Sequence, residues 1–416
     1  MRIVSSYLAG VQGLDRRILL LAAARAVNTM GFSIVMPFLA MYLVEKRGAS
    51  GTTFGLVYLV SGLCAAAGNA VAGEAADRLG RRRMMIAALF LRSANMAALG
   101  SAVILGAPIV VLGALVVLNG VLRSLFDPAA AAAVTELAPP DKRAAAFALQ
   151  RVGINVGWAL GPAIGGAVAA AANYGLLFYV SAAIMIVAGV FVGRVALPPT
   201  APHEARESLT FAGIRAAVRR NRPFFAYLGL VFCGSIMTVQ IFATLSVYAK
   251  TIVGLDEAHI GLLYTVNGVL VVLLQLPAVS LLERGGPRRS LVLGPALYAV
   301  AFLAVGASGS FPTLVAAMVL VTAGEVVFAP ALSDMAAHLG DPRHLGRAFG
   351  LFGLMQQLGL SVGPLVGGLL YDHLRTTPLL MWGALSAGMS VLGIGYFVFA
   401  RVYLGKRDAS GIVRAR

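Results

Sequence analysis

Long apolar runs separated by short polar segments fill the whole 416-residue chain. A membrane-spanning helix needs about 20 apolar residues, whereas a barrel strand needs only about ten. Helices are also the one open-ended structure that satisfies its own backbone hydrogen bonds in lipid. The pattern therefore predicts an all-α membrane protein with twelve transmembrane helices, near residues 18–44, 53–76, 84–105, 108–137, 144–171, 175–196, 224–249, 258–282, 290–308, 312–338, 346–371 and 377–402.

The composition excludes most other classes of protein. Hydrophobic residues make up 59% of the chain and charged residues only 12%, about half the charge of a soluble domain. Soluble globular, disordered, fibrous and disulfide-rich proteins are ruled out, and twelve spans leave no room for a sizeable soluble domain. Cys64 and Cys233 both fall inside apolar runs and are expected to be small core residues.

The net charge of +16 comes from 33 Lys and Arg against 17 Asp and Glu. In a soluble protein it would suggest nucleic-acid binding. Here most basic residues lie in alternate loops, in the central linker and at the two termini, while the opposite side holds Lys46, Arg47, Lys250 and Arg375. The positive-inside rule therefore places both termini in the cytoplasm. We expect a multi-pass protein of a prokaryotic plasma (inner) membrane, with the lipid bilayer and no nucleic acid as partner.

The two halves of the sequence resemble each other. A shift of 202 residues aligns Pro128 with Pro330 and the Gly161-Pro162 pair with Gly363-Pro364. We predict an N-terminal six-helix bundle at 1–196 and a C-terminal bundle with a short tail at 224–416. The cytoplasmic linker at 197–223 is either a short basic amphipathic helix or a solvated segment. Parallel repeats of this kind are used by transporters that work by alternating access.

The loop after the second run resembles the G-x-x-x-D-R-x-G-R-R signature of the major facilitator superfamily. Gly80 allows the sharp turn that this loop needs, and Asp77 suits the positive end of a neighbouring helix. The resemblance implies that Arg81 or Arg82 reaches Glu136 and latches the cytoplasmic side; a plain anchor loop is the alternative. The matching residues are Gly73, Asp77, Arg78, Gly80, Arg81 and Arg82.

The fifth run is similar to the G-x-x-x-G-P-x-x-G-G motif of proton-coupled exporters in the twelve-helix multidrug branch of that superfamily. Glycines four apart make a flat stripe for a neighbouring helix, and the Gly-Pro pair allows bending. Close packing without a coupling role is the alternative. The resemblance implies two pseudo-symmetric six-helix bundles and a monomer; the motif residues are Gly157, Gly161, Pro162, Gly165 and Gly166.

Charges inside the spans are costly, and a functional role is their default interpretation. Glu325, in a Gly-Glu setting that resembles some drug exporters, is our candidate for the principal proton carrier, because burial disfavours a charged carboxylate. A fixed pair with an arginine is its alternative. Arg123 occupies the repeat position of Glu325 and is the expected counter-charge. Asp127 either pairs with Arg123 one turn away or is a second proton site. The family's usual arginine near Val116 is missing.

The remaining polar residues of the spans suggest a substrate cavity lined by Arg25, Asn28, Gln240 and Glu325, although Arg25 is close enough to the surface to snorkel. We expect Arg92 to form a structural pair. No phosphate-binding loop, catalytic constellation or metal-ligand spacing occurs, so an enzyme, a cofactor and a metal site are not expected.

The sequence therefore predicts a secondary active transporter that exports small amphipathic or drug-like molecules in exchange for protons. A proton-coupled importer or facilitator of a small metabolite or lipid-like solute is the alternative, and a channel is a more distant one. The identity and charge of the small-molecule substrate stay open, since both acidic and basic groups are available to a cavity.

Overall fold

The computed structural model describes residues 13–139, 142–197, 221–285, 287–340 and 345–404. All regular secondary structure in these residues is helical, and twelve helices are long and apolar enough to cross a membrane. Each of them coincides with one of the apolar runs. The predicted class, an all-α protein with twelve spans, is confirmed.

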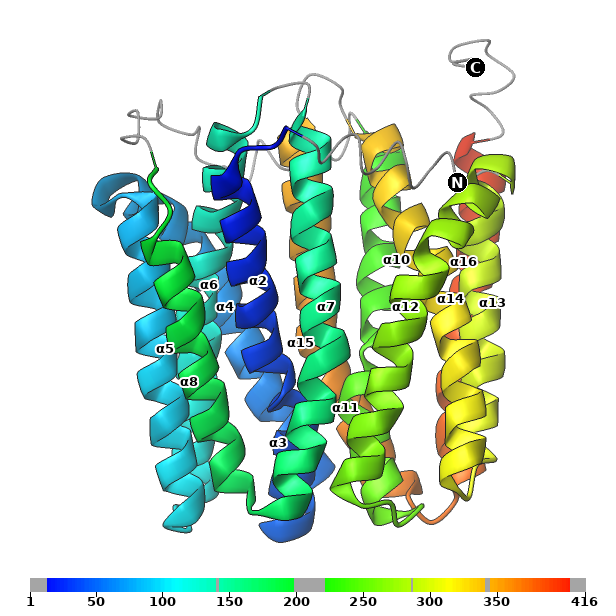
Figure 1. Cartoon of the computed structure of the whole chain (residues 1–416). Helices are drawn as coiled ribbons and strands as arrows, with labels where there is room; N and C mark the ends of the chain where they lie inside the picture. The colour runs from blue at the N-terminus through cyan, green and yellow to red at the C-terminus, as the bar shows by residue number, and fades with distance from the viewer. Residues whose placement is uncertain (1–12, 140–141, 198–220, 286, 341–344, 405–416) are drawn as a thin grey trace. The chain divides into compact units, whose positions relative to one another are not determined.

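The first six spans use eight helical segments (Figure 1). The first span is divided, because Pro37 has no backbone N–H and stands in the first turn of the segment after the break. The segments are α2 (Arg16–Ser33), α3 (Met36–Met41), the π-helical η1 (Tyr42–Lys46), α4 (Gly51–Leu79), α5 (Arg81–Ile104), α6 (Ile109–Leu137), α7 (Arg143–Ala171) and α8 (Tyr174–Gly193).

The last six spans begin with another divided helix, interrupted at Val239. The segments are α10 (Arg222–Thr238), α11 (Gln240–Thr251), α12 (Glu257–Gly285), α13 (Pro287–Gly306), α14 (Phe311–Leu339), α15 (Leu345–Leu374), α16 (Pro378–Phe399) and the π-helical η4 (Ala400–Leu404).

Local sequence signals fix several helix starts. The side chain of Asp15 accepts a hydrogen bond from the backbone N–H of Arg17 at 2.8 Å. Ser50 and Asn173 cap α4 and α8 in the same way, each accepting from an N–H three residues on at 3.0 Å. Such caps satisfy backbone donors that a helix start leaves open. Between α4 and α5, Gly80 has a φ of 87°, a conformation that favours glycine.

The described residues group into two compact units. Of the described residues, unit 1 comprises 13–139, 142–197, 241–272 and 364–372, and unit 2 comprises 221–240, 273–285, 287–340, 345–363 and 373–404. Unit 1 thus includes parts of α11, α12 and α15 besides the first six spans. Most of the predicted linker, 197–223, lies outside the described residues. The sequence-based boundaries of the two bundles stay a prediction.

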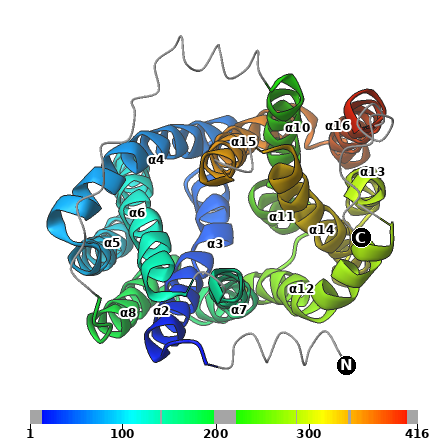
Figure 2. The ribbon, with the colours of Figure 1, turned by 90° about the horizontal axis from the view of Figure 1, so that it is seen from above.

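Unit 1 is built on helix pairs that bury apolar faces. In it α2 packs on α7 and α8, α4 on α6, and α5 on α6 and α8; Figure 2 shows these helices end-on. One core of this unit contains Ile18, Met85, Phe126 and Val192, all almost fully buried.

In unit 2, α13 packs between α14 and α16. Tyr298, Phe302 and Trp382 form a chain of ring contacts there, with centroids 6.0 and 5.6 Å apart.

Candidate functional site

The glycine stripe of α7 receives α2 in unit 1. A Cβ at Gly157 would lie 2.7 Å from the carbonyl oxygen of Ala26, and one at Gly161 would lie 2.9 Å from that of Met30. Ser33 Oγ donates across this contact to the carbonyl oxygen of Gly157 at 2.9 Å. The close helix approach expected from the motif is therefore present.

Two of the remaining residues of the motif, Pro162 and Gly166, face a second helix, α12. A Cβ at Gly166 would meet the carbonyl oxygen of Glu257 at 2.5 Å, and one at Gly261 would meet that of Pro162 at the same distance. The motif thus joins α7 to the start of α12 within unit 1, with Gly165 on the α2 side beside Phe38. α7 is helical throughout, with Pro162 inside it.

The same packing recurs in unit 2, between α15 and α10. A Cβ at Gly359 would lie 2.5 Å from the carbonyl oxygen of Phe232, and one at Gly363 would lie 2.9 Å from that of Ile236. Gln240, predicted for a substrate cavity, is fully buried and donates to the carbonyl oxygen of Gly363 at 2.8 Å. It therefore fastens α15 at the break between α10 and α11.

The signature loop between α4 and α5 holds the expected ion pair. The guanidinium of Arg81, buried to 6% exposure, pairs with the carboxylate of Glu136 on α6. It also donates to the carbonyl oxygen of Ala132 at 3.3 Å. Arg82 donates to the carbonyl oxygen of Gly193 at the end of α8. These contacts fasten the loop to two helices of its own unit.

The other residues of the signature are less informative. Arg78 is exposed at the end of α4. The burial of Gly73 and the side chain of Asp77 are outside what the structure describes. The role of the loop in switching stays a prediction.

Asp127 on α6 pairs with Arg25 on α2, Oδ1 to Nη1 at 2.9 Å. The Arg25 guanidinium also lies 5.8 Å from the ring centroid of Phe126. The Asp127 side chain is 48% exposed and that of Arg25 is 21% exposed. The sequence left two interpretations of Asp127 open, a pair with Arg123 one turn away or a second proton site. The bond to Arg25 joins two helices and is not visible in the spacing of residues along one helix. Arg25 therefore forms an ion pair with a neighbouring helix, which snorkelling of its side chain to the membrane surface does not explain.

Arg92 on α5 is fully buried. Its Nη1 donates to the side-chain oxygen of Asn28 on α2 at 2.6 Å, and its Nε donates to that of Asn119 on α6 at 3.4 Å. Asn28, which we predicted to line a substrate cavity, is 6% exposed, and its side-chain oxygen accepts the hydrogen bond from this buried arginine. The sequence did not point to Asn119, which is an uncharged residue in a long apolar run.

Arg123 is the middle residue of the 29-residue helix α6. Its guanidinium lies 5.3 Å from the ring centroid of Phe32 on α2, in a cation–π contact. The contacts of Arg25 with Asp127, of Arg92 with Asn28 and of Arg123 with Phe32 all lie between α2 and its neighbours α5 and α6. A charge at the centre of a spanning helix costs about 2.5–3.5 kcal/mol on insertion scales, so this concentration of arginines is a strong functional signal.

Glu325 is the middle residue of α14, which also has 29 residues. It lies in unit 2 and is partly buried. Tyr298 packs against the neighbouring Gly324, where a Cβ would lie 2.9 Å from the ring. The structure thus keeps the candidate proton carrier at the middle of its helix.

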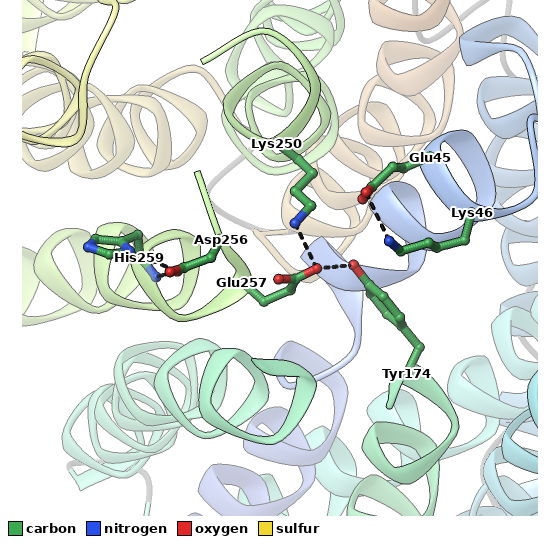
Figure 3. Close-up of polar contacts among 7 residues, drawn as sticks. All are labelled: Glu45, Lys46, Tyr174, Lys250, Asp256, Glu257 and His259. Carbon is green, nitrogen blue, oxygen red and sulfur yellow. Dashed lines mark hydrogen bonds and ion pairs between the residues drawn. The ribbon is translucent and has the colours of Figure 1, made fainter. Parts of the chain in front are cut away.

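A polar cluster missed at the sequence level joins helix ends in unit 1. Glu257 Oε1 lies 3.0 Å from Lys250 Nζ and accepts a hydrogen bond from the hydroxyl of Tyr174 at 2.7 Å (Figure 3). Charge spacing could have suggested the Lys250–Glu257 pair. The hydrogen bond from Tyr174 on α8 could be identified only from the tertiary structure.

Asp372 near the end of α15 caps the start of α4. Its two carboxylate oxygens accept from the backbone N–H groups of Gly51 and Thr52, both at 2.8 Å, and from the hydroxyl of Thr52 at 2.6 Å. A carboxylate at a helix N-terminus is also favoured by the helix dipole. These bonds hold a segment from the second half of the sequence against the second span.

Asp256, just before α12, makes a local cap with His259, accepting from its backbone N–H at 2.8 Å. This bond and the contact with the His259 ring lower the pKa of the Asp256 carboxyl. Among the described residues no cluster of three or more His, Cys, Asp and Glu is placed to hold a metal ion.

The sequence profile of the Major Facilitator Superfamily matches residues 21–258 and residues 237–412. The chain belongs to the major facilitator superfamily. It is therefore a secondary transporter, not an enzyme, and its twelve spans adopt the major facilitator fold.

Two bacterial superfamily members show how far the similarity extends. The chain is 28% identical over 377 residues to the uncharacterized MFS-type transporter YqjV of Bacillus subtilis, with 89% of this chain and 90% of that protein covered. It is 27% identical over 372 residues to the multidrug resistance protein MdtH of Cronobacter sakazakii, with 89% of each covered.

Solved structures of superfamily members show the same fold at lower identity. The nucleoside transporter NupG matches with a TM-score of 0.76 at 14% identity, over 92% of this chain and 99% of that one. A bacterial homologue of the human lysosomal transporter Spinster, in an inward-facing and occupied conformation, matches with a TM-score of 0.76 at 15% identity, over 93% and 97%.

Proposed function

We propose that the protein exports small amphipathic or drug-like molecules in exchange for protons, by alternating access. The observation that carries the proton coupling is Glu325, a partly buried carboxylate at the middle of α14. Proton uptake from outside neutralises this group, and proton release to the cytoplasm restores its charge. Substrate and proton then occupy the transporter in alternation.

The direction of transport rests on the α7 motif and on the relatives. The motif resembles that of proton-coupled exporters, and its glycines bring α7 into close contact with α2 and α12. Several related proteins, from Cronobacter, Photorhabdus and Klebsiella among others, are named multidrug resistance protein MdtH. Both points favour export over import.

The contacts of unit 1 suggest how the outer side closes. The Asp372 cap on α4 and the Tyr174–Glu257–Lys250 cluster involve helix ends that the positive-inside rule assigns to the outside. They join segments of the second half of the sequence to the first six spans. We infer that these bonds form when the transporter is closed to the outside and break when it opens there.

An imposed pH gradient in proteoliposomes of the full-length protein tests the proposal. Fluorescent dyes of different charge serve as substrates, and each gradient direction is applied in turn. An exporter exchanging for protons moves dye against the proton flux and accumulates it. Dye movement with the protons would indicate an importer. Equilibration without accumulation would indicate a facilitator or a channel, and either result would contradict the proposal.

A further inference from the structure

Four aromatic rings from four helices of unit 1 form a continuous row. Phe32 on α2 meets Trp158 on α7 edge-on, with 6.1 Å between the ring centroids and 89° between the ring planes. Trp158 lies 4.8 Å from Phe242 on α11, at a tilt of 42°. Phe242 stacks on Tyr264 of α12 at 5.7 Å and 18°. The row therefore connects α2 and α7 with two helices from the second half of the sequence.

Trp158 lies on the side of α7 that is opposite its exposed apolar surface. That surface is a stripe of four residues spaced four apart, Val152, Val156, Leu160 and Ile164. At 3.6 residues per turn, Trp158 is about 160° around the helix from both Val156 and Leu160. Gly157 contacts α2 and Gly166 contacts α12. The indole ring is therefore on the face of α7 that is turned towards other helices, whereas the exposed stripe suits contact with lipid.

The row of rings lies deep in the spans. Trp158 stands one residue past the middle of the 29-residue helix α7. The backbones of α7 and α12 touch at Gly166, which is about 12 Å further along α7 towards its predicted outer end. The rings are thus on the cytoplasmic side of a tight helix contact, close to the membrane midplane where secondary transporters bind their substrates.

Three of the four rings keep open surface, and the fourth is fixed behind them. Phe32, Trp158 and Phe242 are partly exposed, whereas Tyr264 is only 1% exposed. The Tyr264 hydroxyl donates to the carbonyl oxygen of Ile241 at 2.7 Å, which holds its ring against α11 and beside Phe242. A surface whose rings are already packed against one another loses little side-chain freedom when a ligand binds.

We propose that Phe32, Trp158 and Phe242 form a ring site for the substrate, which binds planar fused aromatic systems of either charge. Aromatic pairs favour offset-stacked and edge-to-face arrangements, and the different tilts within the row offer ring faces and ring edges to one flat molecule. Tyr264 supports Phe242 from behind. The ring site deepens the export function proposed above and rests on it only for the direction of transport, since binding itself needs no gradient.

Four aromatic ions separate the effect of shape from the effect of charge. Acridine orange and pyrenesulfonate are planar ions of opposite charge, while tetraphenylphosphonium and tetraphenylborate are non-planar ions of opposite charge. Equilibrium dialysis of the purified full-length protein, corrected for uptake by detergent micelles alone, measures binding. Each planar ion should bind about tenfold more tightly than the non-planar ion of the same charge, because only flat ring systems stack on the row. Equal or tighter binding of the tetraphenyl ions would overturn the proposal.

Tryptophan fluorescence locates the site, because the chain has only two tryptophans. Trp382→Phe leaves Trp158 alone, and Trp158→Phe leaves Trp382, which is fully buried in unit 2. Acridine orange stacked on the indole should cause static quenching, a loss of emission at unchanged lifetime, in the Trp382→Phe protein and not in the Trp158→Phe protein. Static quenching of Trp382 instead, or binding without quenching of Trp158, would contradict the site.

Substitutions of the rings measure their contribution. Trp158→Leu keeps an apolar side chain without a ring and should weaken binding of both planar ions about tenfold, while changing binding of the tetraphenyl ions less than about twofold. Phe242→Leu should have the same pattern with a smaller loss. Phe90→Leu removes an exposed ring on α5 and should leave binding unchanged. Unchanged planar-ion binding by Trp158→Leu would sink the assignment; if that variant fails to fold, the same result for Phe242→Leu does so.

The two proposals fail separately. If the planar ions bind with this pattern of variants but a pH gradient does not drive their transport, the proton-coupled export is wrong and the ring site stands. If a pH gradient drives export of planar and tetraphenyl ions alike, and Trp158→Leu changes neither binding nor transport, the ring site is wrong and the export stands.

Discussion

Helices α6 and α14 occupy equivalent places in the sequence repeat, yet they carry opposite chemistry. Each has 29 residues and a proline five positions after its middle residue, Pro128 and Pro330. The middle residue is Arg123 in α6 and Glu325 in α14. Asp127 and Asn119 of α6 correspond to Ala329 and Val321 of α14. The repeat therefore preserves the helix frame, while the polar residues at these two positions of α6 are replaced by apolar residues in α14.

This difference supports our proposal that α6 and α14 have different roles in the transporter. In unit 1, Asp127 pairs with Arg25, and the amide oxygens of Asn28 and Asn119 accept hydrogen bonds from Arg92. In unit 2, Glu325 stands at the middle of α14, and the ring of Tyr298 packs against the neighbouring Gly324. A carboxylate at the middle of a membrane-spanning helix is costly to keep charged, which is the reason we propose Glu325 as the proton carrier.

The largest expected effect comes from Glu325→Gln, which removes the titratable group of α14 and keeps its shape. Uphill transport driven by a pH gradient should be abolished, while exchange of labelled for unlabelled substrate at equal pH should persist. Proteoliposome assays of both kinds give the answer. Glu45→Gln, which removes an exposed carboxylate at the outer end, is the control. A Glu325→Gln protein that still accumulates substrate would end the proton-carrier assignment.

The glycine contacts test whether the two repeats share one packing rule. Gly157→Ala and Gly359→Ala place the same methyl group against α2 and against α10, at 2.7 and 2.5 Å from carbonyl oxygens. Each should lower stability by about 1–3 kcal/mol, the usual cost of overpacking. Thermal unfolding in detergent measures it.

Gly353→Ala is the matched control for these two variants, since nothing lies within 4 Å of a Cβ there. It should be neutral or slightly stabilising, because alanine favours a helix over glycine. Equal stability of all three variants would mean that the glycine stripes do not set the helix spacing.

A smaller effect is expected at the Asp372 cap on α4, where a substitution should change the ratio of outward-closed to outward-open protein. Asp372→Asn keeps the size of the side chain but loses the charge that caps α4. Charge-assisted bonds of this kind contribute about 1–2 kcal/mol, so the outward-open population should rise roughly tenfold. Labelling of a cysteine introduced at the outer ends, after Cys64 and Cys233 are replaced by serine, measures this population.

Thr52→Val distinguishes the hydrogen bond from the Thr52 hydroxyl to Asp372 from the two backbone hydrogen bonds that Asp372 accepts at the start of α4. It removes only the hydroxyl that donates to Asp372 at 2.6 Å and leaves both backbone bonds. Its effect should be clearly smaller than that of Asp372→Asn. An Asp372→Asn protein labelled no faster than the parent would show that this cap does not hold the outer side closed.

The smallest effect is expected at Asp256, an exposed cap on α12. Since its folded pKa is lowered by His259, its contribution is present above the unfolded pKa of about 3.9 and is lost as pH falls through the folded pKa. Asp256→Asn should cost about 0.5 kcal/mol near neutral pH. Thermal unfolding at pH 7 and at pH 3 should show the difference shrinking on acidification. A difference that grows there would contradict the lowered pKa.

Much of the fold follows from the chain alone. Twelve apolar runs determine twelve helices, because lipid leaves a backbone no other way to satisfy its hydrogen bonds. The Gly80 turn, the α7 stripe and the Arg81–Glu136 pair also follow from the sequence, since each rests on a short motif or a recognisable family pattern. The presence of Arg123 and Glu325 in the middle of their helices is likewise a matter of counting residues.

Only the tertiary structure decided which groups meet. That Asp127 bonds Arg25, that Asn28 and Asn119 hold Arg92, and that Asp372 caps α4 depend on helices far apart in sequence. Sequence periodicity reports the face of a single helix, whereas partners across helices depend on packing geometry that no single helix encodes. The physical reason is that a buried charge must find its partner in three dimensions, and local spacing shows only the partner one turn away.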